Sequence, residues 1–476
     1  MRKAINCLKI CAFILLTLLI GFNIQKVVSP KFTSSQGMQS GFKNEKSNSV
    51  DVLFLGTSNM FHTINPLVLY EDTGITSFDF GSSSQSLNMT YMYLKEALKT
   101  QNPKVVCLDV LACRSDFNSE LYEPGLRWGF TYFPNGLNKY DGLYEQLGKV
   151  DSEYLSYIFP LFRYKDRWKE LARDDFENSL VTYWKGCTVS YKVTEVKYGD
   201  AYWENIDWEL APRNIEMLDK IRTLCAEEGI ELLFYKAPTP TLWKNVYSNR
   251  IREYADKYGI PFIDYNIKMQ QIGIDTKRDF KDAGHANVYG SVKITRDIGK
   301  YLKEKYILDD HRGGENNSWD IAEAEKNRRE YNAQLLASDN INTFLTLLPD
   351  DSYTILCVFT GDMDDSLKSM LQQYQYIFED DTEICIKKGK ESLFTISNKG
   401  EYIWHDCFFK HDYAAEKTTV ENEDGSVAAI TQIYVDGINY DVIEHGISFV
   451  VIDNKLDKVI GSISFDADND YAKISS

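Results

Sequence analysis

Near the start of the chain the sequence reads Val52-Leu53-Phe54-Leu55-Gly56-Thr57-Ser58-Asn59. Four apolar residues followed by a glycine and two hydroxyl residues are typical of a buried parallel strand that ends in a tight turn. Pro66 and the three apolar residues after it predict that a helix begins shortly beyond this turn. A strand, a sharp turn and a helix would place Ser58 at the carboxyl edge of an open α/β sheet, where such sheets bind ligands. Ser58 is therefore the first candidate nucleophile.

The segments that follow repeat this alternation of strands and helices. Near-continuous apolar runs predict strands at residues 51–55, 76–80, 104–111, 230–235 and 261–264. Apolar residues at helical spacing, with proline starts and glycine stops, predict helices at residues 85–98, 212–228, 248–258 and 287–306. We therefore expect an α/β fold with a doubly wound parallel sheet over residues 50–308. An aromatic-rich insertion of about residues 112–210, with helices of its own, interrupts it.

The two ends of the chain predict separate parts. Residues 1–28 combine a basic start with an apolar run and predict a signal-anchor. The body would then lie outside the cytoplasm, either on a single membrane span or secreted after cleavage. Residues 29–49 are polar and predict a flexible stalk. Residues 309–476 carry short alternating segments and predict a second, β-rich domain with a hairpin near residues 453–465.

Composition excludes some functions and leaves others open. The net charge of −17 argues against nucleic-acid binding, which needs a basic face. The nine cysteines form no CxxC pair, so we expect buried thiols and no structural zinc site. The many aromatic rings of the insertion could stack on sugars, although packing in a core is the commoner use.

A second short motif, Asp282-Ala283-Gly284-His285, precedes the last helix of the α/β domain. A serine hydroxyl becomes a good nucleophile when a histidine takes its proton and a carboxylate orients that histidine. Ser58 follows the first strand and this motif follows the last, so both should reach the carboxyl edge of the sheet. Ser58, His285 and Asp282 are thus predicted as nucleophile, base and orienting acid. The alternative is that Ser58 is only a helix N-cap and His62 a histidine at the surface or pocket rim.

These residues resemble the SGNH/GDSL hydrolases over roughly residues 50–307. Gly56-Thr57-Ser58 is similar to the first block of that family, Phe80-Gly81 to the second and Asp282-x-x-His285 to the last. The resemblance implies a flavodoxin-like fold and an oxyanion hole formed by the N–H groups of Ser58 and Gly81. Gly81 could also be a simple turn glycine.

The third block of the family departs from its usual Gly-x-Asn-Asp. Here the third strand ends in Leu108-Asp109-Val110-Leu111-Ala112, without the asparagine that donates to the oxyanion. Loss of one such donor typically costs about 3–4 kcal/mol of transition-state stabilisation. Asn59 and Gln85 are speculative replacements that would contact substrate.

The resemblance is closest to membrane-anchored, extracytoplasmic proteins that act on surface polysaccharide. It implies a serine esterase or O-acyltransferase that needs no metal or organic cofactor. Its partners would be an acylated cell-surface glycan and a membrane-bound acyltransferase. The rival hypothesis is an inactive accessory protein of glycan modification. In the C-terminal domain, residues 435–440 and 446–453 weakly resemble the PANDER/ILEI lectin-like domain, which implies carbohydrate binding; a plain β-domain with glycine turns is the alternative.

Overall fold

The structure is a computed structural model. It describes residues 2–30, 33–115, 123–171, 175–176, 184–197, 200–204, 206–239, 241–314, 317–348, 352–361, 365–374, 382–388, 391–397, 400–408, 411–421, 427–440 and 442–473. Contacts within the chain divide it into two units, Met1–Lys326 and Asn327–Ser476.

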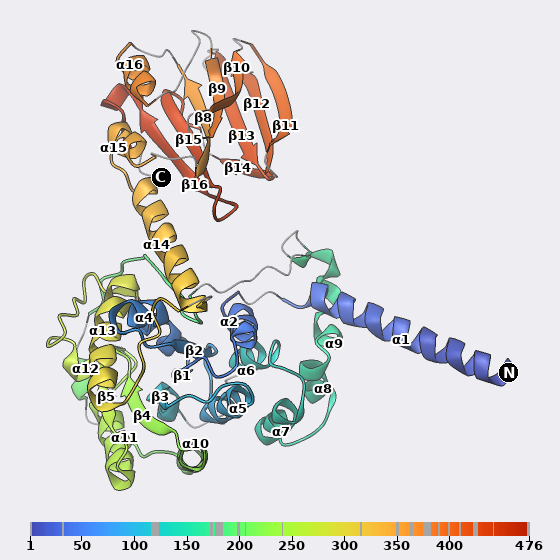
Figure 1. The fold of residues 1–476 in the computed structure, drawn as a ribbon, viewed down its shortest axis with the longest axis vertical. Helices are drawn as coiled ribbons and strands as arrows, with labels where there is room; N and C mark the ends of the chain where they lie inside the picture. Colours follow the sequence, from blue (N-terminus) through green and yellow to red (C-terminus); the bar gives the residue numbers. More distant parts are fainter. Residues whose placement is uncertain are drawn as a thin grey trace. The chain divides into compact units, whose positions relative to one another are not determined.

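The first unit is built on a five-stranded parallel sheet with the order β2-β1-β3-β4-β5 (Figure 1). Its strands are β1 (Val52–Gly56), β2 (Ser77–Gly81), β3 (Val105–Asp109), β4 (Glu231–Lys236) and β5 (Phe262–Asp264). All the residues of the first three strands are buried, as their apolar runs predict. The predicted α/β fold class is confirmed. The strand order reverses between β1 and β3, and this is the switch point at which such sheets bind ligands.

Helices connect successive strands of this sheet, and two more follow its last strand. They are α3 (Ser58–Thr63), α4 (Pro66–Thr73), α5 (Leu87–Ala97), α10 (Pro212–Glu227), α11 (Asn245–Tyr258), α12 (Tyr265–Lys268) and α13 (Val288–Lys305). Helices α4 and α10 begin with proline at the first helical position, where no N–H partner is lost. Helix α4 packs against α13 and α5 packs against α10, which leaves the carboxyl edge of β1 and β3 open to the loops.

Between β3 and α10 lies the predicted insertion. Its described elements are the 3₁₀ helices η1 (Val110–Arg114), η2 (Lys165–Lys169) and η4 (Asp200–Trp203), and the helices α6 (Glu123–Phe130), α7 (Leu137–Leu147), α8 (Ser152–Ile158) and α9 (Leu161–Tyr164). Several of its rings, including Phe130, Phe133 and Tyr157, are buried in the main core. Core packing is therefore the observed role of these three rings.

The segment predicted as a flexible stalk is instead ordered in part. Residues Thr33–Asn44 form helix α2, which packs against β2. Met38 and Phe42 are buried, and the Phe42 ring stacks on Phe80 with centroids 4.1 Å apart. The prediction of a stalk was wrong for this helix because two apolar residues at i and i+4 suffice to bury one face.

The first helix, α1 (Arg2–Val28), contains the predicted anchor. Its portion Lys9–Val28 is long and apolar enough to cross a membrane, a property that a cleaved signal sequence shares.

The second unit is β-rich, as predicted. One antiparallel sheet has the order β10-β9-β8-β15-β16-β17 and the other has the order β11-β12-β13-β14. Their strands are β8 (Tyr353–Thr360), β9 (Thr382–Lys388), β10 (Glu391–Ser397), β11 (Tyr402–Phe408), β12 (His411–Glu421), β13 (Val427–Val435), β14 (Ile438–Tyr440), β15 (Gly446–Asp453), β16 (Lys458–Asp466) and β17 (Ala472–Lys473). The predicted hairpin is formed by β15 and β16, with Asp453 opposite Lys458.

Two apolar layers hold this unit together. One lies between the two sheets, and the other packs the larger sheet against α15 (Ile341–Thr346), α16 (Asp365–Gln373) and the end of α14 (Ser318–Leu336). The unit begins later than the predicted boundary at residue 309. The reason is that Asn317 donates to the Tyr70 hydroxyl and the Trp319 indole donates to the Ser77 carbonyl, so this segment belongs to the first unit.

Candidate active site

Ser58 is the first residue of helix α3, directly after the turn that follows β1. Thr57 is the N-cap, and its hydroxyl accepts a hydrogen bond from the Asn59 N–H. The alternative reading of Ser58 as an N-cap is therefore not what the structure shows. The N–H of Ser58 belongs to the first turn of α3 and has no acceptor within the helix.

Asp282 and His285 face each other across a two-residue turn. They belong to the short antiparallel strands β6 (Phe280–Asp282) and β7 (His285–Ala286), in which the two residues are direct partners. His285 Nδ1 lies 2.9 Å from one Asp282 carboxylate oxygen and 3.1 Å from the other. The Gly284 N–H also donates to that carboxylate, at 2.8 Å, which fixes its orientation.

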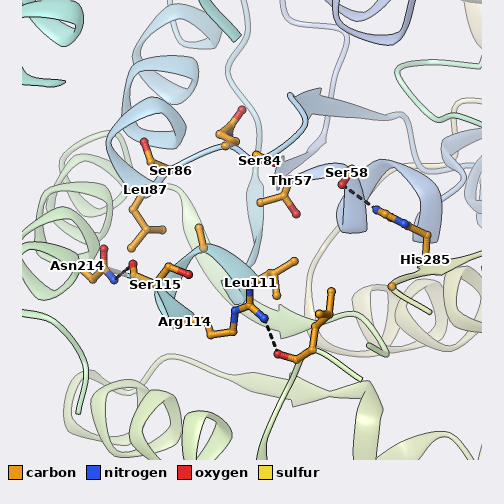
Figure 2. Close-up of a pocket in the computed structure, with 14 residues that line it drawn as sticks. Thr57, Ser58, Ser84, Ser86, Leu87, Leu111, Arg114, Ser115, Asn214 and His285 are labelled. Atoms are coloured by element: carbon orange, nitrogen blue, oxygen red, sulfur yellow. Dashed lines mark hydrogen bonds between the residues drawn. The ribbon is translucent and has the colours of Figure 1, made fainter. Parts of the chain in front are cut away.

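The structure brings this pair to Ser58. Ser58 Oγ lies 2.8 Å from His285 Nε2, although the two residues are far apart in the sequence (Figure 2). With Nδ1–H donating to Asp282, Nε2 is the free acceptor for the Ser58 hydroxyl proton. This is the hydrogen-bond chain that a serine nucleophile requires.

The electrostatics of the site keep the histidine neutral and the aspartate charged. Burial lowers the pKa of His285 below its ordinary value of 6.5, while the Asp282 carboxylate opposes this and Lys281 adds to it. Partial burial opposes ionisation of Asp282, but the Gly284 N–H and His285 keep its pKa below the ordinary value. At neutral pH the imidazole is therefore ready to accept a proton.

His62 lies behind His285 and is buried, so its prediction as a surface or rim residue was wrong. Its ring packs edge-on against His285 with centroids 5.0 Å apart. Its Nδ1 bonds the Thr188 carbonyl at 2.8 Å, and its Nε2 bonds the Lys281 ammonium at 2.8 Å. Burial, with Lys281, lowers the pKa of His62 to about 3, so this ring is a neutral support for His285.

Asn59 is placed beneath the site and does not line the pocket. Its side-chain amide donates to the Gly284 carbonyl at 2.7 Å, and its side-chain oxygen accepts from the Lys236 ammonium at 2.6 Å. Lys236 is fully buried, also donates to the Ala237 carbonyl at 2.6 Å, and lies 3.9 Å from Asp109. Instead of presenting a donor to substrate, Asn59 thus connects the Ser58 turn to the His285 loop.

Two further predicted residues are also occupied by internal contacts. The Gly81 N–H donates to the Met38 sulfur, and Gly81 is not among the residues that line the pocket. A Cβ at Gly81 would lie 2.1 Å from the Gly56 carbonyl oxygen, so glycine is required by the close approach of β1 and β2. Gln85 does line the pocket, but its side chain accepts from Ser82 and donates to Thr90. The oxyanion role of Gly81 stays a prediction.

A pocket of about 260 Å³ opens beside Ser58 at the carboxyl edge of the sheet, at the switch point between β1 and β3. Most of its lining residues, grouped in Figure 2, follow β1, β2 and β3 or belong to the His285 loop; Asn214 of α10 and Leu242 of the loop after β4 complete it. The lining residues are Thr57, Ser58, Ser84, Gln85, Ser86, Leu87, Leu111, Ala112, Arg114, Ser115, Asn214, Leu242, Gly284 and His285. None of these described residues is Trp, Tyr or Phe, so the aromatic groove predicted as an option for the insertion is not seen in this pocket.

Among the described residues, one group has the spacing of a metal site, and it lies apart from this pocket. Asp51, Asp309 and His311 bring ligand atoms close together. His311 Nε2 lies 2.9 Å from Asp51, and the Lys104 ammonium lies 2.7 Å from Asp309, so ion pairs already occupy these groups.

Together, the fold and the site define an α/β protein with a serine–histidine–aspartate hydrogen-bond chain at its topological switch point. No family model matches the sequence, and no curated protein matches it. Among solved structures, a presumed acylhydrolase from Bacteroides fragilis shares 12% identity and a TM-score of 0.28, covering 56% of this chain and 93% of its own.

A diltiazem-metabolizing enzyme of gut microbes also shares 12% identity, with a TM-score of 0.20. The match covers 80% of this chain and 61% of that enzyme, so the chain spans about three fifths of its length. At these TM-scores the likeness carries no conclusion about this chain, and the function has to be argued from its own residues.

Proposed function

We propose that this chain is a serine esterase or O-acyltransferase that works through an acyl-enzyme. The hydrogen-bond chain from Ser58 through His285 to Asp282, at the edge of a pocket, is the observation that carries the proposal. Such a chain activates a hydroxyl toward a carbonyl carbon.

The reaction would proceed in two steps. Ser58 Oγ forms a bond to the ester carbonyl carbon while its proton passes to His285 Nε2. The tetrahedral intermediate then collapses, and the alkoxide leaves with the proton from His285. Water or a sugar hydroxyl next attacks the acyl-Ser58 ester, with His285 again accepting and returning the proton. Asp282 stabilises the imidazolium at each stage.

The SGNH-type resemblance of the motifs supports an acylated cell-surface polysaccharide as the substrate, acted on outside the cytoplasm. The apolar helix Lys9–Val28 is consistent with that location. A glycan-binding role of the β-rich unit and a membrane acyltransferase as partner belong to the same proposal. The departure in the third block supports the rival, an inactive accessory protein.

Turnover of p-nitrophenyl acetate by the full chain in detergent tests the proposal. We expect Ser58→Ala to lower kcat on the order of a thousandfold or more. Ser156→Ala removes a hydroxyl in α8 that bonds only locally to the Glu153 carbonyl, and serves as the matched control. An organophosphorus fluoridate should label Ser58 in the wild-type chain, detected by peptide mass spectrometry. Equal turnover by the wild type and Ser58→Ala, without labelling, would establish the accessory protein instead.

A further inference from the structure

The residue of the pocket that the mechanism leaves unused is Arg114. It is the last residue of η1, which follows β3, and its side chain lines the same pocket as Ser58 and His285 (Figure 2). We infer that Arg114 makes this pocket selective for esters that carry a negative charge, such as a carboxylate, near the scissile bond. This inference rests on the proposed esterase function and specifies its substrate class.

The guanidinium of Arg114 is oriented but not saturated. Nη1 donates to the Leu242 carbonyl at 2.9 Å, which holds one side of the group against the pocket wall. The Trp208 indole N–H donates a hydrogen bond to the Arg114 backbone carbonyl at 3.2 Å, which anchors this turn of the chain. A guanidinium has five N–H donors. Among the described residues the Arg114 guanidinium donates to the Leu242 carbonyl and forms no ion pair with a carboxylate. Donors therefore remain for a ligand.

The charges around the pocket support an anionic ligand. The chain as a whole carries a net charge of −17, which repels anions in general. The described lining residues, by contrast, include no Asp or Glu, and Arg114 is the one permanently charged side chain among them. Nearby, the Asp282 carboxylate is engaged by His285, and Asp109 is buried beneath the sheet edge beside Lys236.

A guanidinium suits this task because its planar fork binds a carboxylate through two parallel hydrogen bonds. A structural brace for one carbonyl would use a single N–H and would not need a permanent charge at a pocket wall. Apart from His285, the other polar side chains of the lining are hydroxyls and amides, including Ser115 and Asn214, which add no charge. Apolar surface is supplied by Leu87, Leu111, Ala112 and Leu242. The pocket thus combines one cation with neutral polar partners.

The test compares esters that are matched except for charge. One pair carries the charge on the acyl side, the mono-p-nitrophenyl ester of succinic acid against p-nitrophenyl butyrate. The other pair carries it on the alcohol side, 4-acetoxybenzoate against its methyl ester. We expect Arg114→Gln to lower kcat/KM for the charged ester of at least one pair by about tenfold, which is the lower range for a charged hydrogen bond in a partly open site. The neutral ester of that pair should change little.

Two variants serve as controls. Arg114→Lys keeps the charge without the planar fork, and should recover part of the loss. Lys300→Gln removes a positive charge from α13 at a side chain that is 78% exposed and does not line the pocket, and should leave the charged-to-neutral ratio unchanged. Equal losses for charged and neutral esters, or no loss in either pair, would overturn the inference while leaving the esterase function in place.

A binding measurement separates the two proposals if turnover is absent. Isothermal titration of 4-acetoxybenzoate into Ser58→Ala, with and without Arg114→Gln, needs no catalysis. If the double variant binds 4-acetoxybenzoate more weakly than Ser58→Ala alone, the anion site is supported even when Ser58 has no activity. Equal binding by the two proteins refutes the site.

Discussion

The contact of Asn59 with Gly284 and Lys236 leads to a prediction that separates a positioning residue from a general structural one. Asn59→Ala removes the donor to the Gly284 carbonyl, at 2.7 Å, and the acceptor of the Lys236 ammonium, at 2.6 Å. Both bonds are buried, since Asn59 is 1% and Lys236 0% exposed. Lys236 would retain the Ala237 carbonyl and the more distant Asp109.

The expected loss of stability follows from these two bonds. A neutral buried hydrogen bond contributes about 1 kcal/mol, and a buried charged donor that loses one acceptor costs about 1–3 kcal/mol. We therefore expect Asn59→Ala to lower the unfolding free energy of the α/β unit by about 2–4 kcal/mol. For a unit of this size that corresponds to a fall in Tm of roughly 3–6 °C, measured by calorimetry.

The effect on catalysis should exceed what stability explains. Gly284 directly precedes His285, so loss of the hydrogen bond to the Gly284 carbonyl should make the position of the His285 ring less fixed. Small misplacements of a catalytic group cost up to about a hundredfold in rate. We expect kcat for p-nitrophenyl acetate to fall by about ten- to a hundredfold, with KM nearly unchanged because Asn59 does not line the pocket.

A matched variant distinguishes this role from a loss of packing. Asn266 is also a buried asparagine, whose side chain bonds the Thr239 N–H and Asp264. Asn266→Ala should lower Tm to a similar degree and leave kcat close to that of the wild type. The reasoning is refuted if Asn59→Ala retains full kcat, or if both variants lose kcat equally.

The other predictions concern His285 and helix α2. The rate should rise with pH through the pKa of His285, below 6.5, and Lys281→Met should move this acid limb to higher pH because Lys281 lowers that pKa. Asp282→Asn should move the acid limb to lower pH, because Asp282 raises the pKa of His285, and should reduce kcat on the order of 10³–10⁴-fold. The pH profile of kcat/KM measures both shifts. A shift in the opposite direction for either variant would contradict the assignment of His285 as the base. Phe42→Ala should lower the unfolding free energy by about 3 kcal/mol because a buried ring leaves a cavity against Phe80, and unchanged thermal unfolding would show that α2 does not pack there.

Much of the α/β unit could be predicted from the sequence because its signals are local. The buried strands are short apolar runs, and Pro66 and Pro212 mark helix starts whatever surrounds them. The short separation of Asp282 and His285 also made their contact predictable, since a two-residue turn brings such residues face to face. Helix α2 was missed because its only apolar face consists of residues such as Met38 and Phe42 in a polar segment, although their spacing of four was a usable signal.

The supports of the site lie beyond such local signals, because they join residues from separate strands. Lys236 at the end of β4 and Asp109 at the end of β3 are charged residues at positions that the pattern assigns to the core. Burial lowers the pKa of Lys236 to about 8, even though Asp109 opposes the shift. A charge buried at such a cost has to be held by several partners. One of them is Asn59, which connects this charge to the loop of His285.

In the family that the motifs resemble, an asparagine of the third block stands close to this edge. Here Asp109 stands at the end of the third strand, where it is fully buried 3.9 Å from Lys236 and does not line the pocket. Through Asn59 the pair supports the loop of His285 from below. In the proposed mechanism, oxyanion stabilisation would then come from backbone N–H groups such as that of Ser58.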